Sequence, residues 1–182
     1  MNTEPELPPG KIIARVAAGS ALTIAAGHSA ESFDKFALWF LAAFCAGLAL
    51  IVSHLKEVSV FIPLSTIASA SYLFLFATVV CAAQRYVAMT ITSGAAAAKD
   101  GREMGDKLQY MDCDEFIAQM LQGVPWPMHA MCKQMFDALA KGDHAVGGRL
   151  FMRLAMLHAV LVSIEFIILL VALAKIINAI KA

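Results

Sequence analysis

Apolar residues form a long stretch near the end of the chain, from Leu154 to Ala174, bordered by Arg153 and Lys175 and interrupted by one charged residue, Glu165. A helix needs about 20 such residues to cross a hydrocarbon core about 30 Å thick. The stretch is long enough, so residues 150–182 are predicted to form a transmembrane helix.

Two further apolar runs have the same character, at residues 36–52 and 58–83. Each is long enough to span a bilayer, and the second ends at a glutamine and an arginine. Only the short polar segment 53–57 separates them. We therefore expect residues 34–93 to form an antiparallel transmembrane hairpin.

The N-terminal part of the chain is harder to place. Residues 11–33 have helical character but a marginal hydropathy, which fits either a fourth span or an amphipathic helix at the membrane surface. Gly19, Thr23 and Gly27 recur every four residues, a spacing of small side chains that lets helices approach closely in membranes. Residues 1–10 are rich in proline and glutamate and are predicted to be a disordered tail.

Residues 94–149 are polar enough to lie outside the bilayer, and their pattern predicts short amphipathic helices. Asp112 and Glu115 have the spacing of a capping box that opens a helix over residues 116–122. A second helix is expected over residues 127–140, since a proline stands at its first turn. The last helix should follow directly and run into the membrane.

Lysine and arginine gather on one side of the predicted spans. Eight of them lie between Arg85 and Arg153, against Lys56, Lys175 and Lys181 on the other side. The positive-inside rule then places the polar module in the cytoplasm. The predicted fold is all-α: a polytopic helical membrane protein with three transmembrane helices, a candidate fourth, and a small cytoplasmic helical module, expected in a bacterial inner membrane.

Composition agrees with this fold class and removes one class of partner. Of the 182 residues, 60% are hydrophobic, above the roughly 45–50% of soluble domains. Basic and acidic residues balance to a net charge of zero, so no basic surface for nucleic acid is predicted. The four cysteines show no disulfide or zinc spacing. We predict no cofactor, no metal site and no catalytic residues.

A carboxylate inside a spanning helix usually serves a function and has a partner, because it is expensive to bury in lipid. His158 lies seven residues before Glu165 and should share its helix face. The pair could relay protons or line a pore, or Glu165 could be a structural hydrogen-bonding group. Arg85 should lie too far along its helix to be a direct partner, so the expected partners are Glu165 of a second protomer or three side chains of the second span, Ser71, Tyr72 and Thr78.

Eight of the ten methionines fall between Met104 and Met156. Methionine is flexible, so a methionine-lined helix face can pack in a core or form an adaptable docking surface. The soft sulfur atoms could also hold copper(I), which is the weakest of the three interpretations. The residues expected to bind a partner are Met128, Met131, Met135 and Trp126.

These features favour a non-enzymatic membrane protein that forms a homo-oligomer and couples a cytoplasmic protein partner or signal to the lipid bilayer. Such a task would suit a membrane effector or sensor, for example in a bacterial antiviral defence or toxin system. The alternative is a proton or cation channel or transporter that uses Glu165 and His158. Membrane copper handling is a weaker third alternative.

Overall fold

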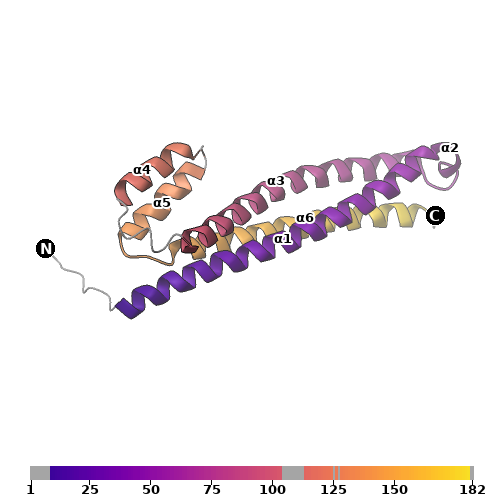
Figure 1. The fold of residues 1–182 in the computed structure, drawn as a ribbon. Helices are drawn as coiled ribbons and strands as arrows, with labels where there is room; N and C mark the ends of the chain where they lie inside the picture. Colours follow the sequence, from indigo (N-terminus) through magenta and orange to yellow (C-terminus); the bar gives the residue numbers. More distant parts are fainter. Residues whose placement is uncertain (1–8, 104–112, 125, 127, 181–182) are drawn as a thin grey trace. The chain divides into compact units, whose positions relative to one another are not determined.

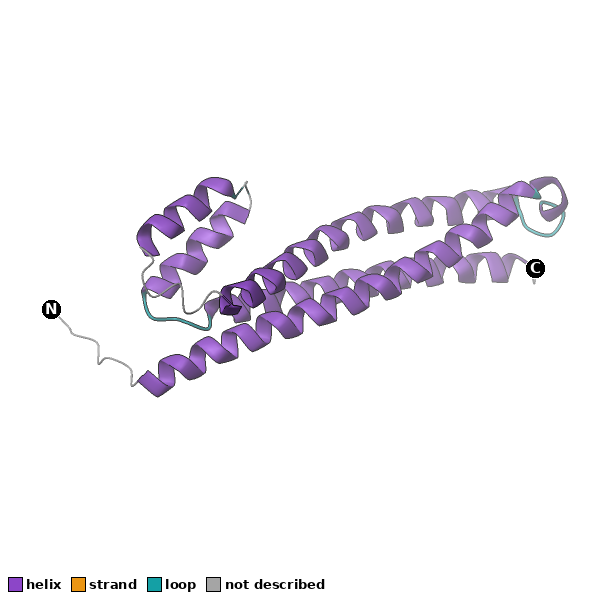
Figure 2. Cartoon of the chain, in the orientation of Figure 1, coloured by secondary structure: helices purple, strands orange, loops and turns teal. Residues whose placement is uncertain are grey.

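The computed structural model describes residues 9–103, 113–124, 126 and 128–180, and within these ranges every regular element is a helix (Figures 1 and 2). The predicted all-α class is confirmed. The helices are α1 (Pro9–Ser53), α2 (Leu55–Val58), α3 (Leu64–Glu103), α4 (Cys113–Gly123), α5 (Met128–Ala140) and α6 (Val146–Ile180).

Three of these helices are long and apolar enough to cross a membrane, as predicted: α1, α3 and α6. They contain 45, 40 and 35 residues. At 1.5 Å per residue they are about 68, 60 and 52 Å long, well beyond the roughly 30 Å of a hydrocarbon core. Each helix therefore extends beyond any single crossing of the bilayer.

No separate fourth helix forms from residues 11–33, because this segment is the first part of α1. The chain stays helical through the polar stretch that follows. Lys35 Nζ donates to Glu31 Oε1 at 2.7 Å, and Ser32 Oγ donates to the carbonyl of His28 at 2.9 Å. The i,i+4 pair of Glu31 and Lys35 supports a continuous helix where the sequence suggests a break between two segments, and the serine hydroxyl is accommodated within it.

The helix formed by the second apolar run is longer than the run itself. The run ends before Gln84 and Arg85, but α3 continues to Glu103. Residues 95–98 are four alanines, and alanine has the highest helix propensity of all residue types. No proline occurs in α3 to interrupt the helix. A charged residue marks a change of solvent along a helix and does not end it.

The chain divides into two compact units. Unit 1 comprises residues 1–27 and 91–154, and unit 2 comprises residues 28–90 and 155–182. Each of the long helices α1, α3 and α6 contributes residues to both units without a break.

Unit 2 holds an apolar core near the hairpin that joins α1 to α3. Ile62 and Ile67 pack there with Ala172 and Ile176 of α6. Aromatic rings continue this packing along α1, where the centroids of Phe40 and Phe166 lie 4.6 Å apart. The rest of the surface of unit 2 is largely exposed aliphatic side chains, as expected for helices that face lipid.

Unit 1 contains the helical pair α4 and α5, which begin and end within a few residues of their predicted limits. Gly142 has a positive φ of 82° just after α5, a backbone conformation that favours glycine and ends the helix. α6 then begins at Val146, next to the predicted start of the last helix.

Candidate functional site in a buried polar layer

Glu165 of α6 has its hydrogen-bond partner on α3. Gln84 Nε2 donates to Glu165 Oε2 at 2.5 Å, and both side chains are buried. An amide that donates to a carboxyl group satisfies part of the polar demand that burial creates. The carboxyl group expected to need a partner therefore finds one within its own chain.

The three side chains of the second span that were expected to bond to Glu165 do not do so in the structure. Ser71 Oγ and Thr78 Oγ1 donate to carbonyls of their own helix at 2.9 and 2.7 Å, and Tyr72 is 74% exposed. The difference lies in how α3 and α6 are shifted along one another. In the structure Gln84 of α3, and not Ser71, Tyr72 or Thr78, lies level with Glu165 of α6.

An ion pair lies beside this contact. Arg85 Nε is 3.6 Å from Asp34 Oδ1, which connects α3 to α1. Both side chains are partly exposed, so the pair is in contact with the surroundings of the bundle and contributes little to stability by itself. It places charged groups directly next to the buried Gln84.

His158 is fully buried about two turns before Glu165 on the same face of α6. Its ring meets Phe33 edge to face, with centroids 6.4 Å apart and an angle of 70° between the planes. Neither ring nitrogen has a hydrogen-bond partner among the described residues. We call the five side chains Asp34, Gln84, Arg85, His158 and Glu165 the polar layer.

The cavity beside Glu165 is too small to hold a water molecule, and the rings of Phe36, Phe40 and Phe166 line it. Glu165 Oε1 and Gln84 Oε1 also lack partners within the described part of the chain. A proton relay between His158 and Glu165 would need a hydrogen bond or a bridging water, and no hydrogen bond connects the two side chains within the described part of the chain.

The small residues of α1 are used for packing inside unit 1. A Cβ atom on Gly148 would lie 2.4 Å from the carbonyl oxygen of Gly19, and one on Gly27 would lie 2.6 Å from the Cβ of Ala95. Thr23 is buried and donates to the carbonyl of Gly19 at 2.9 Å. Gly19, Thr23 and Gly27 thus form a ridge of small residues, the glycine ridge, that packs α1 against α6 and α3 of the same chain.

The two features that suggest self-association therefore both have contacts within one chain. The glycine ridge packs internally, and Glu165 bonds to Gln84. The formation of a homo-oligomer stays a prediction, which light scattering can test.

The methionines expected to bind a partner differ in their surroundings. Met131 and Met135 of α5 line a cavity together with Arg149 and Arg153 of α6. Met128 is half-buried, and Trp126 in the preceding loop is 84% exposed.

Copper(I) is a poor fit to this face of α5. Two guanidinium groups share the cavity with Met131 and Met135, and they would repel a cation. Burial raises the pKa of the Cys132 thiol, which disfavours the thiolate that binds metal. Among the described residues, no three His, Cys, Asp or Glu side chains are grouped to hold a metal ion.

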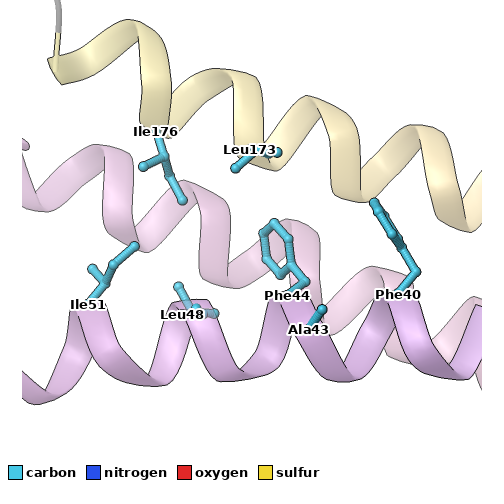
Figure 3. A pocket seen from close by; sticks show the side chains of 8 residues that line it. Phe40, Ala43, Phe44, Leu48, Ile51, Leu173 and Ile176 are labelled. Carbon is cyan, nitrogen blue, oxygen red and sulfur yellow. The ribbon is translucent and has the colours of Figure 1, made fainter.

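An apolar groove lies between α1 and α6 in unit 2, with a volume of about 280 Å³ (Figure 3). Figure 3 shows Ile51 and Ile176 reaching toward one another from the two helices. The lining is Phe40, Ala43, Phe44, Gly47, Leu48, Ile51, Leu173 and Ile176. No polar side chain lines it, so it has nothing to orient a polar substrate.

Comparisons of this chain with protein-family models, with curated proteins and with solved structures find no match.

Proposed function

We propose that this chain is a non-enzymatic integral membrane protein that couples a binding event at unit 1 to the bilayer around unit 2. The supporting observation is that α1, α3 and α6 each pass from one unit to the other as unbroken helices. A continuous helix is a stiff element, so a displacement at one end is carried along it.

The polar layer is the proposed boundary of the hydrocarbon core. Glu165 contacts Gln84, which follows the apolar run 64–83 of α3, and Phe166 packs against Phe36, where the apolar run of α1 begins. The 20 residues of that α3 run rise about 30 Å, the thickness of the core. Glu165 would then lie at one edge of the core, whereas the sequence had suggested the centre.

Side chains on either side agree with this boundary. Glu31 and Lys35 are exposed by 56% and 68% just outside it, which suits water and not lipid. Trp39 and Tyr86 are exposed within a few residues of it, as in the aromatic belts of membrane proteins.

The excess of lysine and arginine in unit 1 supports a cytoplasmic location for the polar module. We expect a cysteine introduced as Lys141→Cys to be protected from a membrane-impermeant thiol reagent in intact cells, and Ala182→Cys to react. Both variants are made in a background without the four native cysteines. The opposite labelling pattern would reverse the orientation.

Transport is the second candidate, and the site gives it less support. A channel or carrier needs a continuous polar path, but the cavity at Glu165 excludes water and the neighbouring groove is lined only by apolar side chains. Glu165 is better explained as a hydrogen-bonding group that fixes α6 against α3.

Coupling is tested by disturbing unit 1 and measuring the reactivity of Cys81, which is buried in unit 2. The full chain is placed in lipid nanodiscs with its other three cysteines replaced. Gly148→Ala should disturb the packing of α1 on α6 in unit 1. We expect it to speed modification of Cys81 by a permeant maleimide at least about fivefold, as a change of about 1 kcal/mol in local opening would do.

Two control variants make the result specific. Gly147→Ala meets Met135 Sδ at an ordinary 3.5 Å and should leave the rate unchanged. Two glycines inserted between Leu154 and Ala155 interrupt α6 at the junction of the units and should abolish the effect of Gly148→Ala. If Gly148→Ala loosens unit 1 by hydrogen exchange while Cys81 reacts as before, the units are not coupled.

A further inference from the structure

A cavity in unit 1 combines apolar walls with positive charge. It lies between α5 and the first turns of α6 and has a volume of about 280 Å³. Its lining residues are Met131, Gln134, Met135, Val146, Arg149, Leu150 and Arg153. Pockets that bind small molecules have volumes of about 300 Å³ or more, so this cavity is near the lower limit.

The charged residues that line the cavity are both arginines, four residues apart on one face of α6. Arg149 forms an ion pair with Asp143, which fixes its guanidinium at the rim. Arg153 is exposed and has no ion-pair partner within the described part of the chain. After the Asp143 pairing, the cavity retains one unbalanced guanidinium with free donors for a carboxylate or phosphate group.

Four of the other lining residues are apolar. Met131 and Met135 come from α5, and Val146 and Leu150 come from α6. Methionine side chains can change shape to fit different apolar groups. The amide of Gln134 adds a polar group that can donate or accept beside the arginines.

We propose that this cavity binds an acidic amphipathic segment of a protein partner. A carboxylate of the segment pairs with Arg153 and Gln134, and an adjacent apolar side chain packs on Met131 and Met135. The inference rests on the coupling function proposed above, and it names the chemistry of the partner that would act on unit 1.

The cavity offers a guanidinium next to apolar side chains. This combination favours a protein segment with an acidic residue beside an apolar one over a lipid headgroup, which is polar throughout.

The test uses the full chain in nanodiscs of uncharged phosphatidylcholine. The probe is a fluorescent synthetic helix of about 14 residues, four turns, with leucine at the i, i+3, i+4 and i+7 positions and glutamate elsewhere. Binding is followed by fluorescence anisotropy. The proposal expects saturable binding that weakens at least about tenfold when the glutamates of the probe are replaced by glutamine, since charged hydrogen bonds are the strong ones.

Variants of the protein locate the site. Arg153→Gln should weaken binding about tenfold or more, and Arg153→Lys should weaken it less because the charge remains. The matched control is Lys133→Gln, which removes one positive charge from α5 at an exposed residue outside the cavity lining. It should change the affinity less than about twofold, in proportion to a screened surface charge. Both positions are exposed, so we expect all three variants to keep the fold, and melting curves check this.

Four results would overturn the proposal. They are equal weakening by Lys133→Gln and Arg153→Gln, equal binding of the glutamine probe, displacement of the probe by micromolar short-chain phosphatidylglycerol, and a gain in affinity on deletion of residues 1–8. The third would identify a lipid ligand, and the fourth would identify the acidic start of this chain as the occupant. The Cys81 experiment does not use the probe, so a failure of the ligand class is separable from a failure of coupling.

Discussion

Gly148→Ala is expected to lower the apparent melting temperature of the detergent-solubilised protein by about 5 °C or more. The added methyl group would lie 2.4 Å from the carbonyl oxygen of Gly19 and 2.7 Å from its Cα atom. Both atoms belong to backbone, so α1 and α6 must move apart. Overpacking of this kind costs about 1–3 kcal/mol, and each kcal/mol corresponds to about 2–4 °C in a chain of this size.

The neighbouring glycine supplies the control. A methyl group at Gly147 meets Met135 Sδ at 3.5 Å, which is normal contact, and alanine is the better helix former by up to about 1 kcal/mol. Gly147→Ala should therefore melt at the wild-type temperature or above it. Light scattering on Gly148→Ala separates the two uses of the ridge, because a lower mass without a lower melting temperature would mean that Gly19 and Gly148 pack between chains.

Local signals in the sequence predicted the helices of unit 1 well. Asp112 and Pro127, the residues expected to open these helices, lie outside the described residues. The amphipathic pattern that predicted α4 and α5 depends only on the sequence of each segment, so its meaning does not depend on the rest of the fold. The three membrane-capable helices were predicted for a similar reason. An apolar run of about 20 residues has few stable solutions other than a spanning helix.

The contacts between helices could not be predicted in the same way. Hydropathy sets how long a helix is, but it does not set how far one helix is shifted along another. The register of α3 against α6 decides that Gln84 meets Glu165, and a shift of a few residues would have brought Thr78 there instead. The glycine spacing in α1 likewise predicts a close contact without saying whether the other helix belongs to the same chain.

The contact between Gln84 and Glu165 gives the other large expected effect. Glu165→Leu leaves Gln84 buried with both polar atoms unpaired, which costs about 1–3 kcal/mol, or a loss of about 5 °C. Glu165→Gln keeps an oxygen that can accept from Gln84 Nε2 and should melt within about 2 °C of the wild type. In the double variant Gln84→Leu/Glu165→Leu both polar groups are gone, so most of the lost stability should return.

The same three variants separate a structural Glu165 from a transporting one. In proteoliposomes with a pH-sensitive dye inside, we expect wild type and Glu165→Gln to leak protons no faster than empty vesicles, because the cavity at Glu165 is too narrow for water. Glu165→Leu should fail through instability, and Gln84→Leu/Glu165→Leu should restore assembly without any change in flux. A proton flux in the wild type that disappears in the stable Glu165→Gln protein would replace the coupling function with transport, since that variant keeps the hydrogen bond and removes only the ionisable group.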